Sequence, residues 1–202
     1  MKVLLLSPYP EKIIPALQDV GDSYLTYEKP IDLQFCIGQH IDFIVSYGYR
    51  YIISESILSS YLCRAINLHI SMLPHARGAH PTFWTIFDNL PLGVTIHLID
   101  AGLDTGNILV QKELSINYDH HTFASIYKLQ NLEITKLFNA NWKYLRDGGL
   151  SGWRQNGPAT LHRSYELKRW IECMPNQWET PISVFKKLVK KRIAHLSNDM
   201  QQ

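Results

Sequence analysis

Residues 65–78 read AINLHISMLPHARG, an apolar run that carries Asn67 and His69 and then breaks into a loop with a proline and a glycine. Successive side chains of a β-strand point to opposite faces, so Asn67, His69 and Ser71 are expected to share one side. In open α/β sheets, ligands bind beyond the carboxyl ends of the strands. Three polar side chains at such a strand end therefore indicate a functional site there.

The segments around this run alternate between short apolar strands and helical patterns. Strands are predicted at residues 2–9, 23–28, 41–48, 65–70, 93–100 and 107–116, and helices at residues 11–20, 31–40, 54–62, 81–89 and 122–146. Strands that alternate with helices form a mainly parallel sheet with helices on both faces. The sequence thus predicts a Rossmann-like α/β fold.

The character of the chain changes near Gly148, where turn residues become frequent before a last helical pattern from Pro181. We expect a catalytic domain at residues 1–147 and a small C-terminal appendage, a turn-rich hairpin and helix, at residues 148–202. Trp153, Trp170 and Trp178 lie in a segment too small to bury them alone. They predict a homodimer interface, unless they fold back on the catalytic domain.

Composition excludes several classes of protein. The 202 residues are 46% hydrophobic and 19% charged, with a formal net charge of +2. These values are typical of a globular protein and give no support for a nucleic-acid partner. The basic run at residues 186–192 is expected to be a solvated helix face. The three cysteines are widely spaced and the apolar runs are short, so we expect a cytoplasmic protein that does not bind a membrane.

Residues 93–106, GVTIHLIDAGLDTG, supply a second polar cluster. If its strand lies beside residues 65–70, His69 and Asp104 converge, and this pair can transfer a proton or stabilise a developing charge. Asn67 would add a neutral hydrogen-bond donor. A structural histidine and an ordinary Asp turn are the plain alternatives. The DTG triplet alone does not make an aspartic protease, which needs two such carboxylates on an all-β fold.

Metal binding is another possible role for the histidines. His75, His80 and His97 could join His69 around a metal ion. No carboxylate or cysteine completes a recognisable ligand spacing, so the sequence predicts no metal.

The ordered set of motifs resembles the signature of the folate-dependent formyltransferases. It comprises Asn-x-His at 67–69, Ser-x-Leu-Pro at 71–74, Arg-Gly at 77–78, Gly-Val-Thr at 93–95 and Asp-x-Gly-Leu-Asp-Thr-Gly at 100–106. The resemblance covers about residues 41–114 and is most similar to the sugar N-formyltransferases. It implies that Asn67, His69 and Asp104 are the catalytic trio and that 10-formyltetrahydrofolate is the co-substrate.

The resemblance also implies which segments hold the two substrates. The pterin of the donor would be held largely by backbone groups of two segments, namely Tyr49, Arg50, Tyr51, Ile52, Ile53, Ile99, Asp100, Gly102 and Leu103. For Ile52 and Ile53, core packing is part of the expectation. The acceptor would lie against the loop after the Asn-x-His strand, namely Ser71, Met72, Pro74, His75, Arg77 and Gly78.

Differences between this sequence and the family's subgroups narrow the range of expected acceptors. The loop SPYPEK at residues 7–12 has no glycine, which argues against the phosphate-gripping loop of the ribonucleotide enzymes. The chain ends too early for the tRNA-reading domain, and its tail is similar to that of sugar N-formyltransferases. We therefore expect a small-molecule acceptor, a nucleotide-linked amino sugar. However, the N-terminal half is shortened by about one βα unit, which puts the standard nucleotide-sugar pocket in question.

Other functions remain open at this stage. The acceptor could be another small amine, such as hydroxyornithine or glycinamide ribonucleotide. The same donor site could deliver water, which would make the protein a formyltetrahydrofolate hydrolase. A catalytically inactive folate-binding module is the third class, against which the intact trio argues.

Overall fold

A computed structural model describes residues 1–150 and 152–199. Its main sheet has six strands in the order β2-β1-β3-β4-β6-β7. Their bounds are β1 Lys2–Leu6, β2 Ser23–Tyr27, β3 Phe43–Ser46, β4 Ala65–His69, β6 Gly93–Leu98 and β7 Ile108–Glu113. The pairings from β2 to β4 are parallel, whereas β6 is antiparallel to both β4 and β7. The predicted mixed, mainly parallel sheet is confirmed.

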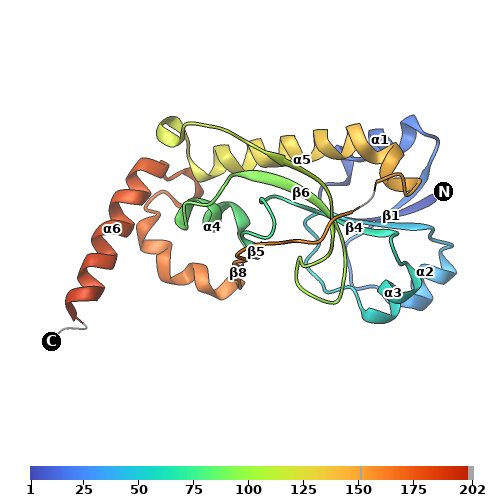
Figure 1. The fold of residues 1–202 in the computed structure, drawn as a ribbon, viewed down its shortest axis with the longest axis horizontal. Helices are drawn as coiled ribbons and strands as arrows, with labels where there is room; N and C mark the ends of the chain where they lie inside the picture. Colours follow the sequence, from blue (N-terminus) through green and yellow to red (C-terminus); the bar gives the residue numbers. More distant parts are fainter. Residues whose placement is uncertain (151, 200–202) are drawn as a thin grey trace.

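Helices cover both faces of this sheet, as predicted (Figure 1). The helices of the described chain are α1 Ile14–Asp19, α2 Leu33–Gly38, α3 Glu55–Ser60, α4 Pro81–Phe87, α5 Phe123–Arg146 and α6 Ile182–Asp199, with 3-10 helices at Pro10–Lys12, Tyr118–His120, Ser164–Cys173 and Gln177–Glu179. Helices α1 and α5 bury their apolar side chains against one face, and α2 and α3 against the other. No helix within the described ranges is long and apolar enough to cross a membrane.

The long helix α5 begins where the sequence predicts it. The Thr122 side chain accepts a hydrogen bond from the Ser125 N–H, and the Ser125 hydroxyl accepts one from the Thr122 N–H. This reciprocal cap satisfies donors that the first helical turn leaves free. The helix then buries Ile134, Phe138 and Trp142 against the sheet. It therefore packs behind β4 and β6.

The C-terminal segment runs back along the body of the protein (Figure 1). Trp153 exchanges two backbone hydrogen bonds with Ile108, and β8 (Leu161–His162) pairs with β5 (Arg77–Gly78). Within the described residues, these extended pieces pair with the body instead of with each other, so the predicted hairpin is wrong. The backbone groups of both pieces find partners in loops of the main domain.

The three tryptophans of this segment have different surroundings. Trp170 packs on Phe87 with ring centroids 4.4 Å apart, and Trp178 lies edge-on to Phe123. Trp153 is 48% exposed. Two of the three side chains therefore fold back on the main domain, and the predicted dimer interface would have to rest on other surface. The division of the chain at residue 147 stays a prediction.

Candidate active site

Three polar side chains meet at the end of β4. Asn67 and His69 lie two residues apart on that strand, and Asp104 comes from the turn after β6. The Asn67 Nδ2 atom donates to Asp104 Oδ1 at 3.2 Å, and His69 Nδ1 lies 3.6 Å from Asp104 Oδ2. The structure thus brings together the three residues that the sequence singles out.

The spacing of the Asp-x-Gly-Leu-Asp-Thr-Gly motif has a local physical explanation. The Asp100 carboxylate accepts from the Gly102 N–H at 3.1 Å and the Thr105 hydroxyl at 2.6 Å, which closes the turn. A Cβ atom on Gly106 would lie 1.8 Å from the Leu98 carbonyl oxygen, so only glycine lets the chain return this closely. Asp104 takes a left-handed backbone conformation, with φ of +53°. The turn holds its carboxylate toward β4.

Donors surround the carboxylate of Asp104 on several sides. Besides Asn67 and His69, the Gly78 N–H donates to Oδ2 at 2.9 Å and His97 Nε2 lies 3.5 Å from Oδ1. Burial would raise the pKa of Asp104, but the charge of His69, the hydrogen bond and charge of His97 and the Gly78 N–H outweigh it. The pKa of Asp104 therefore lies well below its usual range, and the group is a carboxylate at neutral pH.

The hydrogen-bond partners fix where hydrogens sit around this carboxylate. His69 Nε2 lies 3.0 Å from the Ala76 carbonyl oxygen, and His97 Nδ1 lies 2.7 Å from the Leu98 carbonyl oxygen. A carbonyl only accepts, so both of these nitrogens carry a hydrogen. A second proton on His69 would sit on Nδ1, facing Asp104. An imidazolium beside a carboxylate can stabilise negative charge that develops on a substrate.

Sequence reasoning missed the role of His97 in this cluster. The antiparallel pairing of β4 and β6 places His97 directly opposite Asn67, and His97 Nε2 lies 3.2 Å from Asn67 Nδ2. With a hydrogen on Nδ1 alone, Nε2 of His97 accepts from Asn67, whereas with a second proton Nε2 donates to Asp104 instead. In the first case the two amide hydrogens of Asn67 are shared between Asp104 and His97. An antiparallel pairing of these two strands, had it been assumed, would have revealed this contact.

The predicted acceptor residues occupy one loop but differ in their surroundings. Ser71 is fully buried, and its hydroxyl donates to the His75 carbonyl oxygen at 2.7 Å. β4 has already ended at His69, so strand alternation no longer holds and Ser71 does not join the cluster. The remaining residues of the set are half-buried, namely Met72, Pro74, His75, Arg77 and Gly78.

The predicted donor residues lie on two loops, one after β3 and one after β6. Ile53 is 7% exposed and belongs to the core, whereas Ile52 is 91% exposed. Tyr51 and Leu103 are each about half exposed. The expectation of core packing is therefore right for Ile53 and wrong for Ile52. Both loops therefore present exposed apolar side chains, Tyr51 and Ile52 on one and Leu103 on the other.

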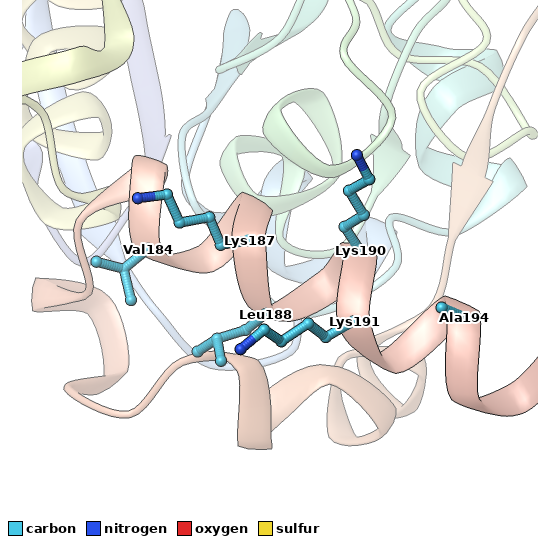
Figure 2. A pocket seen from close by; sticks show the side chains of 6 residues that line it. All are labelled: Val184, Lys187, Leu188, Lys190, Lys191 and Ala194. Atoms are coloured by element: carbon cyan, nitrogen blue, oxygen red, sulfur yellow. The ribbon is translucent and has the colours of Figure 1, made fainter.

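Two shallow depressions on the surface lie elsewhere. The larger, of about 560 Å³, is lined by residues of α6, namely Val184, Lys187, Leu188, Lys190, Lys191 and Ala194 (Figure 2). The other lies between α6 and α4. Neither includes a residue of the cluster around Asp104. Among residues 1–150 and 152–199, no group of three or more His, Cys, Asp or Glu side chains could hold a metal ion.

Comparisons with known proteins point to one family. A family model described as "Formyl transferase" matches residues 37–139. The crystal structure of the formyltransferase PseJ from Anoxybacillus kamchatkensis, in complex with UDP-4,6-dideoxy-4-formamido-L-AltNAc and tetrahydrofolate, is 37% identical. The match covers 92% of this chain and 97% of that one, with a TM-score of 0.87. A 4-N formyltransferase from Francisella tularensis, 20% identical, shares the fold with a TM-score of 0.71 over 84% of this chain and 78% of that one.

Curated relatives include methionyl-tRNA formyltransferases. That of Clostridium novyi (strain NT) is 27% identical over 190 residues, which is 94% of this chain. The chain spans 60% of the length of that relative.

Proposed function

The chain belongs to the formyl transferase family, and from this premise we propose that it transfers the formyl group of 10-formyltetrahydrofolate to the amine of a nucleotide-linked amino sugar. The observation that carries the proposal is the cluster of Asn67, His69 and Asp104, because it combines hydrogen-bond donors with an ionised carboxylate. Acyl transfer to an amine needs both kinds of group.

In this mechanism the acceptor nitrogen attacks the formyl carbon, and the electrons of the C=O bond move onto oxygen. Asn67 and His69 donate hydrogen bonds to that oxygen, each worth roughly 3 kcal/mol in the transition state. Asp104 takes the proton of the attacking amine, directly or through water, and holds the charge of His69. When the C=O bond re-forms, the C–N bond to tetrahydrofolate breaks, and the proton passes to the departing nitrogen.

The hydrogen-bond partners in the structure add one requirement to this mechanism. The Nε2 hydrogen of His69 and both amide hydrogens of Asn67 already have protein partners. At least one of these donors must therefore exchange its partner for the formyl oxygen when the substrates bind. Catalytic hydrogen bonds often tighten only in the complex with substrate, so this requirement agrees with the proposed roles.

The likeness to PseJ supports the choice of acceptor. That structure contains a UDP-linked sugar with a formamido group at position 4, together with tetrahydrofolate. The match covers 97% of the PseJ chain, so the short N-terminal half that the sequence displays is shared with a protein that binds a nucleotide sugar. We therefore propose a UDP-linked 4-amino-4,6-dideoxy sugar as the acceptor, and a cytoplasmic homodimer as the acting form.

An acceptor panel tests this proposal. The protein is incubated with 10-formyltetrahydrofolate and, in turn, UDP-linked 4-amino sugars, dTDP-linked 3-amino sugars, glycinamide ribonucleotide, hydroxyornithine and methionyl-tRNA. Release of tetrahydrofolate and the formylated product are both measured. Turnover confined to the 4-amino sugars is the expected result. Preferred turnover of methionyl-tRNA would refute the proposed sugar acceptor and identify methionyl-tRNA as the acceptor. Formate release without any amine would indicate a hydrolase.

A further inference from the structure

We propose that Gln155, from the C-terminal segment, is a positioning residue that fixes the Asp104 turn against the acceptor loop. The inference rests on the proposed function for its turnover assay. It assigns a role in the reaction to a segment that lies about fifty residues beyond the signature motifs.

The side chain of Gln155 joins the two loops that meet at Asp104. Its Nε2 atom donates to the Asp104 carbonyl oxygen at 2.9 Å and to the Gly106 carbonyl oxygen at 2.8 Å. Its Oε1 atom accepts from Arg77 twice, at 2.6 Å and 3.2 Å. Both hydrogens and the oxygen of the amide are therefore in use, and each contact involves a loop that carries a predicted site residue.

Among side chains of this length, only an amide can both accept from Arg77 and donate to the two carbonyl oxygens. A glutamate of the same size can accept from Arg77 but cannot donate to the two carbonyl oxygens, and a lysine can donate but cannot accept. The carbonyl of Asp104 also belongs to a residue with a left-handed backbone, a conformation that persists only when its surroundings hold it. The two hydrogen bonds from Gln155 supply that support.

The rest of the segment holds the acceptor loop in the same way. The Thr160 hydroxyl accepts from the Ala76 N–H at 2.7 Å, and β8 pairs with β5, which contains Gly78. The Gly78 N–H in turn donates to Asp104 Oδ2. Residues 155–162 thus set the distance between the Gly78 N–H and the Asp104 carboxylate from both sides.

Loss of this support has an electrostatic consequence. The groups that face the Asp104 carboxylate are His69 and Asn67 on β4, His97 on β6 and the Gly78 N–H on β5. Together they hold the pKa of Asp104 below its usual range. If the turn relaxes away from them, that pKa must rise toward its ordinary value. By contrast, replacing a residue that only stabilises the fold would leave the pKa of Asp104 unchanged in the molecules that remain folded.

Gln155→Met tests the inference, because methionine has nearly the same length and no amide. Asn156→Ala, an exposed neighbour in the same segment, is the matched control. We expect kcat/KM to fall about 100-fold in Gln155→Met, as for other misplaced catalytic groups. The pKa of Asp104, followed by NMR of its labelled carboxyl carbon without substrates, should rise. Asn156→Ala should change neither.

Two outcomes would overturn the inference: activity within about threefold of the parent, or lost activity with an unchanged pKa of Asp104 in the folded protein. If Gln155→Met does not fold, Gln155→Glu keeps the size and the Arg77 contact. A large loss of activity at neutral pH in Gln155→Glu then supports the inference, and parental activity refutes it. Since the NMR measurement needs no acceptor, failure of the whole acceptor panel would refute the proposed function and leave this test intact.

Discussion

Replacing Asp104 by asparagine removes one negative charge and almost no volume. The carboxylate accepts from the Gly78 N–H at 2.9 Å and Asn67 Nδ2 at 3.2 Å, with two histidine nitrogens at 3.5 and 3.6 Å. An amide keeps one acceptor oxygen, so its NH₂ group must face donors on the other side. We expect kcat to fall by about 10²–10⁴, which corresponds to roughly 3–5 kcal/mol in the barrier.

The same substitution should change how stability depends on pH. The pKa of Asp104 is lowered in the folded protein, so the group contributes stability above its unfolded pKa of about 3.9 and loses it as pH falls toward the folded value. The melting temperature of the parent should therefore drop more steeply than that of Asp104→Asn below about pH 5.

One control variant serves both the predicted loss of kcat and the predicted change in acid stability. Asp119→Asn makes the same chemical change at an exposed position in the 3-10 helix Tyr118–His120 and should leave turnover and the acid response unchanged. Turnover is followed as tetrahydrofolate release at saturating concentrations of both substrates. If Asp104→Asn kept more than about a tenth of the parental kcat, the assigned role in proton transfer would be wrong.

Four further outcomes are expected. His97→Ala should lower kcat about tenfold or more with little effect on donor KM, since it removes a partner of Asn67; steady-state kinetics at saturating acceptor measure this. Gly78→Ala should cost at least an order of magnitude in kcat/KM and lower the melting temperature, because its φ is +83° and the new Cβ would lie 2.4 Å from the carbonyl oxygen of His162. Asp22→Ala should destabilise the fold by roughly 3–5 kcal/mol in urea unfolding, because the buried Asp22 carboxylate pairs with Arg146 and accepts a hydrogen bond from the buried Trp142. Sedimentation equilibrium should show a dimer that persists on dilution, and a monomer at every concentration would exclude the proposed homodimer.

Much of the fold follows from short-range pattern alone. Buried strands such as Phe43–Ser46 are continuous apolar runs, and α5 has both a helical spacing and a recognisable cap at Thr122. The trio was predictable for the same reason, because strand alternation places Asn67 and His69 on one face. Alternation failed at Ser71, where the strand had already ended and a local hydrogen bond to His75 decided the direction of the side chain.

What the sequence could not supply are contacts that depend on how distant segments are paired. The contact between His97 and Asn67 needs the direction of β6, which runs antiparallel in an otherwise mainly parallel sheet. An apolar run is equally compatible with either direction, because side-chain alternation is the same in both.

The place of Gln155 in the site is harder to predict from sequence than that of His97. Its segment is rich in turn residues, and its partner strand β5 is only two residues long, too short to leave any pattern in the sequence. Its place in the site follows from the backbone of residues 153–162, which pairs first with Ile108 and then with Arg77 and Gly78. A polar residue in such a turn-rich segment is normally interpreted as part of a solvated loop. Here the two pairings bring it beneath the Asp104 turn, where its amide completes hydrogen bonds that the signature motifs leave open.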